Sequence, residues 1–333
     1  MSEVVATEIS RVRSEQWIDG GVRRPYDPRI GRIVSDATAD TFHVWERVVP
    51  GTHPEPGRWI TMLPGFPDGS FGYAQVDAAL GATPDPRLYV EFLGHGDSDK
   101  PRAYAYSTVE RAALVVAHWQ AHAVTETTVV AFDYATLVVL ELLAQQLEGQ
   151  ARLPRITGVL MANGGLFTDA HSHPWQTTPF MKTRAGKVTE LAKYSPAIFR
   201  SVLRMSQMYS PTYTPSREEF DDWFAIMNRR DGMHILHNDA AFVTAHKTEG
   251  DRLDFTRLYR AYRNEIAFIV TGADGDVLEG RQTVAARDRL AAEGLDVRTH
   301  PGGHLTTHEH PRLLAATIRE LAERQLDENG NNS

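Results

Sequence analysis

Short apolar runs rich in branched residues alternate with segments of helical periodicity over much of the chain. The runs predict buried strands, and the periodic segments predict amphipathic helices. The predicted strands are residues 59–63, 88–92, 127–132, 156–161, 266–271 and 297–300, after a β-like run at 41–48. The predicted helices are residues 107–123, 136–147, 282–293 and 311–326. Such alternation is typical of an α/β fold, a mostly parallel sheet covered by helices.

One segment, residues 166–246, breaks this alternation. It has no buried-strand pattern and combines many aromatic residues with short, proline-interrupted helical stretches. We interpret it as a helical cap inserted into a core formed by residues 1–165 and 247–333. An aromatic cap predicts a small, mainly apolar organic substrate. The candidates for contacting that substrate are Trp175, Tyr194, Tyr209 and Trp223.

Composition excludes several classes of function. The chain has 333 residues, no cysteine, 35 Lys and Arg against 43 Asp and Glu, and a net charge of −8. Without cysteine there is no disulfide, no cysteine-bound metal and no thiol nucleophile. The acidic balance argues against a nucleic-acid partner. The apolar stretch 127–147 contains Asp133 and Glu141, so we expect a strand and a helix rather than a membrane span.

The N-terminal residues show no apolar stretch of the kind found in signal peptides, because Glu3, Glu8, Arg11 and Arg13 interrupt it. We therefore expect a cytoplasmic protein. The sequence leaves the oligomeric state open, a homodimer included.

The strongest chemical signal lies between the predicted strand 127–132 and the helix after it. Asp133 stands there, with the small residues Ala131 and Ala135 two places before and after it. This small-x-nucleophile-x-small pattern is typical of a nucleophile elbow, a tight strand-to-helix turn. The alternative is an Asp that only caps the following helix. We favour the nucleophile because other motifs accompany it.

Two of these motifs follow other predicted strands. Leu63-Pro64-Gly65-Phe66-Pro67 comes after the strand 59–63, and its Phe66 N–H is a candidate oxyanion-hole donor together with the Tyr134 N–H. Late in the chain, an acidic loop holds Asp274 and Asp276, and Pro301-Gly302-Gly303 precedes His304. A metal site at His304, His308 and His310 is the weaker interpretation, because Pro311 interrupts the helical spacing. We expect no metal and no cofactor.

Taken together, these motifs resemble the α/β-hydrolase family, and within it the branch with an aspartate nucleophile, the epoxide hydrolases and haloalkane dehalogenases. The resemblance covers residues 59–321 and includes Gly94–Pro101, which is similar to the family's Gly-x-Gly-x-Ser-Asp-Lys-Pro. It implies Asp133 as nucleophile, His304 as base and Asp276, in preference to Asp274, as the acid that orients His304. The chain departs from the family pattern at Pro64, where histidine is usual, and at the elbow.

A carboxylate at the elbow suits attack on an electrophilic sp3 carbon, which gives an ester on the enzyme that water then hydrolyses. The resemblance implies epoxide hydrolysis first, with cap tyrosines or Tyr259, in a Tyr-Arg pair, donating a proton. Dehalogenation is the alternative, although position 134 holds Tyr where haloalkane dehalogenases commonly have Trp. A third alternative is a relative that binds a ligand without hydrolysing it.

Overall fold

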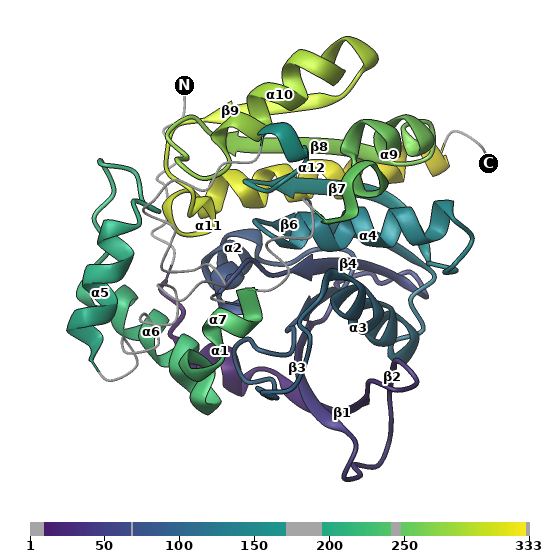
Figure 1. Ribbon diagram of the computed structural model, residues 1–333. Helices are drawn as coiled ribbons and strands as arrows, with labels where there is room; N and C mark the ends of the chain where they lie inside the picture. Colours follow the sequence, from purple (N-terminus) through teal and green to yellow (C-terminus); the bar gives the residue numbers. More distant parts are fainter. Residues whose placement is uncertain (1–9, 68, 171–194, 241–247, 331–333) are drawn as a thin grey trace.

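The computed structural model describes residues 10–67, 69–170, 195–240 and 248–330. These residues form a nine-stranded sheet in the order β2-β1-β3-β5-β4-β6-β7-β8-β9 (Figure 1). The strands are β1 Val22–Asp27, β2 Arg32–Ile33, β3 Phe42–Val49, β4 Arg58–Leu63, β5 Arg87–Val90, β6 Glu126–Phe132, β7 Arg155–Ala162, β8 Ala267–Ala273 and β9 Asp296–His300. The strands from β5 to β9 in this order pair in parallel, and β1, β2 and β3 pair antiparallel.

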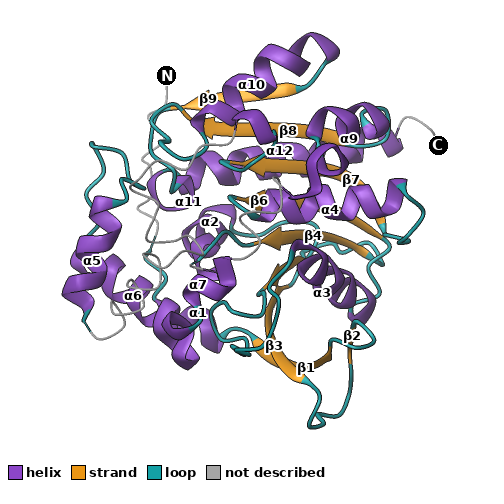
Figure 2. Ribbon diagram, in the orientation of Figure 1, coloured by secondary structure: helices purple, strands orange, loops and turns teal. Residues whose placement is uncertain are grey.

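Helices cover both faces of the sheet (Figure 2). They are α1 Ser14–Asp19, α2 Ala74–Leu80, α3 Thr108–Ala121, α4 Ala135–Leu147, α5 Pro196–Met205, α6 Arg217–Asn228, α7 Leu236–Asp239, α9 Phe255–Tyr262, α10 Gly280–Leu290, α11 Thr306–Glu309 and α12 Pro311–Gly330. Short 3-10 turns include η1 Gly69–Tyr73 and η5 Arg229–His234. The predicted mostly parallel sheet with flanking helices is confirmed, and each strand predicted from the sequence is present to within two residues.

Strand β6 shows why the sheet can be covered on both faces. Its side chains alternate between two hydrophobic layers, Val129 and Ala131 in one and Val130 and Phe132 in the other. The first layer contains residues of α3, α4, α9 and α10, and the second contains residues of α1, α2 and α12. A central strand that is buried on both sides needs a continuous apolar run, which is what the sequence has here.

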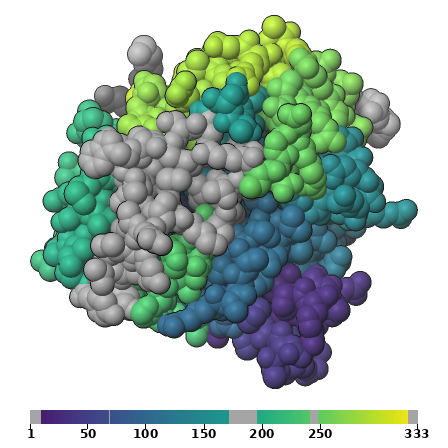
Figure 3. Space-filling model, in the orientation of Figure 1, coloured from purple at the N-terminus to yellow at the C-terminus, as the bar shows by residue number. Residues whose placement is uncertain are grey.

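Between β7 and β8 the described residues form helices and contain no strand. In the space-filling view the teal-green residues of α5 lie at the left and the purple N-terminal strands lie at the lower right (Figure 3). Two buried carboxylates tie this helical segment to the loop after β5. Arg230 Nε donates a hydrogen bond to Asp97 Oδ1 at 2.8 Å, and Asp239 Oδ2 lies 2.9 Å from His95 Nε2.

Among the helices that the structure describes, none is both long enough and apolar enough to cross a lipid bilayer.

Candidate active site

Asp133 occupies the tight turn between β6 and α4. Its backbone has a φ of 54°, the left-handed region that residues other than glycine seldom adopt. Two hydrogen bonds hold this conformation: the Asp133 N–H donates to the Ala162 carbonyl at 2.9 Å, and Thr136 Oγ1 donates to the Asp133 carbonyl at 2.8 Å. Backbone strain that the surroundings hold in place is common at functional sites.

Two glycines on neighbouring loops allow the chain to approach this turn closely. A Cβ atom on Gly65 would lie 2.6 Å from a ring carbon of Phe132, and one on Gly164 would lie 2.5 Å from the Asp133 carbonyl oxygen. The small residues Ala131 and Ala135, which marked the elbow in the sequence, are buried in the core. The elbow therefore depends on glycine at two positions in the adjacent loops, where a larger residue would collide with it.

The structure brings His304 and Asp276 to Asp133. His304 Nε2 lies 3.3 Å from Asp133 Oδ1, and His304 Nδ1 lies 3.0 Å from Asp276 Oδ2. The other oxygen of Asp276 accepts hydrogen bonds from the N–H groups of Leu278 and Glu279, at 2.8 and 3.1 Å. All three members are buried. The contact with His304 is made by Asp276, whereas Asp274 of the same loop is exposed.

The remaining oxygen of Asp133 is held by the backbone. Phe66 N–H donates a hydrogen bond to Asp133 Oδ2 at 2.8 Å, as the oxyanion-hole interpretation of the loop after β4 requires. Tyr134 follows Asp133 in the first turn of α4, and its ring centroid lies 6.2 Å from that of Phe66. The role of the Tyr134 N–H as a second donor stays a prediction.

Two carboxylates set the protonation of His304. Burial lowers the pKa of His304, but the charge of Asp276 and the hydrogen bonds and charge of Asp133 outweigh burial, so the pKa is raised well above its usual range. The two carboxyl groups therefore favour the protonated form of His304. Any reaction that neutralises Asp133 removes part of this stabilisation and makes His304 a stronger acid.

Sequence reasoning missed two residues that position the His304 loop. Asn163 Nδ2 donates a hydrogen bond to the His304 carbonyl at 2.9 Å. Glu309 Oε1 accepts hydrogen bonds from the N–H groups of Gly303 and Ser210, at 3.2 and 2.8 Å. Asn163 had a usable signal, since it directly follows a buried parallel strand and so lies at the same edge of the sheet as Asp133. Glu309 had none, because its contacts depend on the fold.

A third carboxyl group near the triad, that of Glu279, was also missed. The residue is buried and immediately precedes α10. Burial and the charges of Asp276 and Asp133 raise the pKa of Glu279 well above its usual range, although His304 and a hydrogen bond from Gln282 act in the opposite direction. Burial and these neighbouring charges therefore favour the protonated form of Glu279.

The structure does not bring Tyr259 to the site, so its expected role as proton donor is wrong. Tyr259 lies in α9, its ring packs on Phe268 at the start of β8, and its hydroxyl donates to the Glu293 carbonyl at 3.1 Å. Asp133, Asp276 and His304 all follow the carboxyl ends of their strands. Tyr259, in contrast, belongs to the core beside the amino end of β8, which is the opposite end of the sheet.

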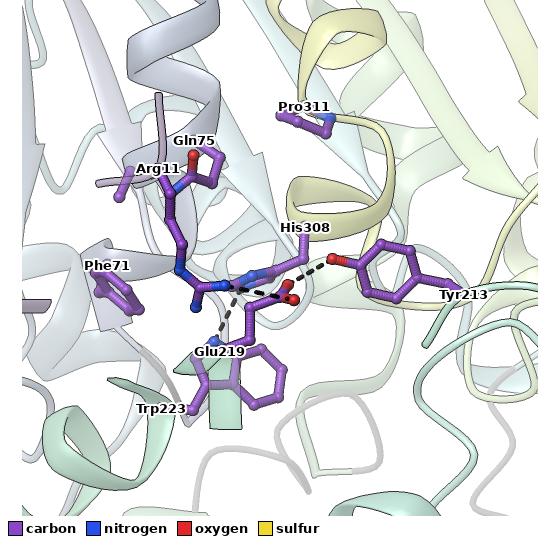
Figure 4. A pocket seen from close by; sticks show the side chains of 9 residues that line it. Arg11, Phe71, Gln75, Tyr213, Glu219, Trp223, His308 and Pro311 are labelled. Carbon is purple, nitrogen blue, oxygen red and sulfur yellow. Dashed lines mark hydrogen bonds and ion pairs between the residues drawn. The ribbon is translucent and has the colours of Figure 1, made fainter. Parts of the chain in front are cut away.

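Of the residues expected to contact substrate, Trp223 and Tyr209 can be placed. Their rings stack with centroids 5.6 Å apart, and Trp223 Nε1 donates a hydrogen bond to His308 Nε2 at 3.1 Å. Trp223 and His308 line a cavity of about 410 Å³ between α2, α6 and α11 (Figure 4). Its described lining includes none of Asp133, Asp276 and His304. Trp175 and Tyr194 lie outside the described residues.

Within the described ranges, no three His, Asp or Glu side chains come together in a way that could hold a metal ion.

Replacing Asp276 with asparagine is expected to lower kcat by about 10²- to 10⁴-fold, because the charge and hydrogen bond that orient His304 are lost. The same change should lower the pKa of His304, since Asp276 is the largest influence raising it. Activity assays and NMR titration of the histidine measure both effects. Asp274→Asn, in the same loop but exposed, is the matched control. An unchanged His304 titration in Asp276→Asn would contradict the geometry.

Comparison with known proteins identifies the family. The alpha/beta hydrolase family matches residues 62–317 of this chain. A Mycobacterium tuberculosis protein named "Putative hydrolase LipZ" is 30% identical over 226 residues, which are 67% of this chain and 69% of that protein. The mesoderm-specific transcript protein of Mus musculus is 23% identical over 190 residues, 56% of each chain, so the chain spans little more than half of that relative.

Solved structures with the same fold carry different activities in their names. The haloalkane dehalogenase DatA from Agrobacterium tumefaciens C58 superposes with a TM-score of 0.65 at 13% identity, covering 92% of this chain and 97% of that one. The epoxide hydrolase CorEH superposes with a TM-score of 0.59 at 14% identity, covering 92% and 99%. At these identities the likeness concerns the fold alone. The sheet, the elbow and the family match over most of the chain together show that this protein belongs to the α/β-hydrolase family.

Proposed function

We propose that the chain is a hydrolase that opens epoxides to diols through an ester formed on Asp133, without a cofactor. One observation carries the proposal: a carboxylate, and not a hydroxyl, stands at the elbow between the Phe66 N–H and His304. A carboxylate attacking an acyl carbon would form an anhydride, whereas its attack on a saturated carbon forms a stable ester. The substrate should therefore carry an electrophilic sp3 carbon.

The two oxygens of Asp133 have different surroundings, which suits a two-step reaction. In the first step Oδ1 attacks the epoxide carbon, the carbon–oxygen bond of the ring breaks, and the leaving oxygen takes a proton. Oδ2, held 2.8 Å from the Phe66 nitrogen, becomes the carbonyl oxygen of the ester. When water attacks this ester, negative charge develops on Oδ2, where the Phe66 N–H already donates.

The second step needs a neutral histidine, and the first step provides it. Esterification removes the charge of Asp133, which is one of the influences that raise the pKa of His304. The pKa of His304 then falls towards its usual range, and the imidazolium releases its proton, which replaces the one taken by the leaving oxygen. The neutral imidazole can then accept a proton from water. Asp276 keeps its hydrogen bond to Nδ1 throughout and stabilises the imidazolium that forms.

Dehalogenation is a second candidate, and the name of the solved dehalogenase with the same fold supports it. A halide leaves without a proton but needs N–H donors around it. Tyr134 stands at the position after the nucleophile, where a donating Trp would favour this reaction, and a phenol donates through its hydroxyl instead. Epoxide hydrolysis is therefore our first choice. If the protein instead binds such compounds without hydrolysing them, His304→Ala should leave ligand binding unchanged.

A single-turnover reaction in H2 18O tests the ester route. With enzyme in excess over the fastest epoxide of a mixed epoxide and haloalkane panel, the diol of the first turnover should contain oxygen from Asp133 and no 18O. Later turnovers should incorporate the label, because water has by then replaced an oxygen of Asp133. Mass spectrometry of the diol measures this. Full incorporation of 18O in the first turnover would reject the ester, and halide release without any diol would favour dehalogenation.

A further inference from the structure

A third carboxyl group shares the buried cluster with the triad, and the reaction described above gives it no role. We propose that Glu279 is a further catalytic residue, the proton donor to the leaving oxygen of the substrate. This role rests on the proposed epoxide chemistry, in which the leaving alkoxide takes a proton.

The position of Glu279 is fixed by the triad itself. Its N–H donates to Asp276 Oδ1 at 3.1 Å, while the other oxygen of Asp276 holds His304 at 3.0 Å. The residue is only 2% exposed, so its carboxyl lies inside the protein. Asp133, Asp276 and His304 all act electrostatically on this carboxyl, and it acts in turn on the Tyr134 hydroxyl. Glu279 therefore belongs to the same cluster as the reacting carboxylate.

The charge balance of this cluster favours a protonated Glu279. Two carboxyl groups, those of Asp133 and Asp276, already contact His304. Burial, and after it the charges of Asp276 and Asp133, disfavour a further negative charge here and raise the pKa of Glu279 well above its usual range. A neutral carboxylic acid has an O–H to donate.

Tyrosines in the described part of the chain are less suited to this task. Tyr259 lies at the opposite end of β8, and Tyr209 is stacked between Tyr213 and Trp223. The Tyr134 hydroxyl does lie near Asp133, but burial and the charges of Asp133 and Glu279 raise its pKa well above the usual range for a phenol. A carboxylic acid releases a proton to an alkoxide more readily than such a phenol does.

The proton balance closes over one turnover. As Asp133 Oδ1 bonds to the epoxide carbon and the ring carbon–oxygen bond breaks, the Glu279 proton moves to the leaving oxygen. His304 then releases its proton, which restores Glu279. Water adds to the ester carbonyl and gives one proton to His304, the bond between the Asp133 carbonyl carbon and the diol oxygen breaks, and that oxygen takes the second proton of the water. Asp133 is again a carboxylate, and His304 is again protonated.

Glu279→Gln separates this role from a structural one. Rapid-quench kinetics should show ester formation from the epoxide slowed by about 10²-fold or more, with ester hydrolysis unchanged. The wild-type rate of ester formation should fall at alkaline pH as Glu279 loses its proton, and this fall should be missing in the variant. Asp274→Asn, which removes an exposed carboxyl from the same loop, should behave as wild type.

Ester formation at the wild-type rate in Glu279→Gln, or equal slowing of both steps, would overturn the proposal. Loss of the same step in Tyr134→Phe or Tyr194→Phe, with Glu279→Gln unaffected, would overturn it in favour of a tyrosine donor. If Glu279→Gln does not fold, Glu279→Leu gives the same volume without a proton to donate, and the same kinetic result is expected.

A stability measurement tests the neutral state without any substrate. A carboxyl whose pKa is raised by folding binds its proton more tightly in the folded protein, so wild-type stability should decline as pH rises above the usual carboxyl range. Glu279→Gln should remove part of this decline in thermal denaturation between pH 5 and about pH 8. Parallel curves for the two proteins would show that Glu279 is ionised and would reject the donor. If no epoxide is hydrolysed but the two stability curves differ as expected, only the proposed epoxide reaction is rejected, and the neutral state of Glu279 stands.

Discussion

Replacing Asp133 with alanine is expected to lower kcat on the epoxide substrate by about 10⁴-fold or more, because the atom that attacks carbon is removed. The ester can no longer form, so both steps of the reaction are lost together. The fold should persist, since the backbone hydrogen bonds of the turn involve the main chain of residue 133. Steady-state assays of diol release, with circular dichroism as a check on folding, measure the effect.

Asp133→Asn is the closer match in shape, because the amide occupies nearly the same volume as the carboxylate. Its activity should be absent at first and can rise slowly through deamidation. Asp274→Asn again controls for the loss of a charge elsewhere. Wild-type turnover from the first minute in Asp133→Asn would remove Asp133 from the reaction and with it the proposed ester.

Replacing His304 with glutamine is expected to stop the reaction halfway. The ester should still form, because His304 acts on water and not on the epoxide, while hydrolysis should slow by about 10²- to 10⁴-fold. Enzyme mixed with epoxide should therefore accumulate as a covalent adduct. Intact-protein mass spectrometry should show an increase equal to the mass of the substrate, and peptide mapping should place it on Asp133.

His308→Gln is the matched control, since His308 lies in the nearby helix α11 and contacts Trp223 instead of the triad. It should form no lasting adduct and should turn over epoxide. An adduct in neither variant, together with normal turnover in His304→Gln, would show that another group activates the water.

The fold could be predicted because its core strands are buried on both faces. Such strands appear in the sequence as unbroken apolar runs, and β6 and β7 are clear cases. Strands β1 and β2 escaped prediction, since the first has exposed and half-buried positions and the second is two residues long. Their pairing depends on β3, which lies beside them only in the folded chain.

The candidate site could be predicted where a reactive residue comes soon after a predicted strand. Asp133, Asp276 and His304 come soon after β6, β8 and β9, so the parallel sheet alone places them at one edge. Tyr259 was misplaced because a short Tyr-Arg motif says nothing about which end of the sheet its helix covers. Glu279 was missed because a charged residue in an acidic loop normally faces solvent, and only the fold shows that this one is buried.

The order of the strands in the sheet makes the His304 loop easier to displace by local unfolding than the rest of the site. Strand β9 is the outermost strand at its end of the described sheet and pairs only with β8, while β6 lies in the interior of the sheet. Local opening of an edge needs far less free energy than global unfolding. Fraying of β9 would displace the loop that holds His304, while Asp133 would stay in place. We therefore expect heat or denaturant to inactivate this protein before the sheet unfolds.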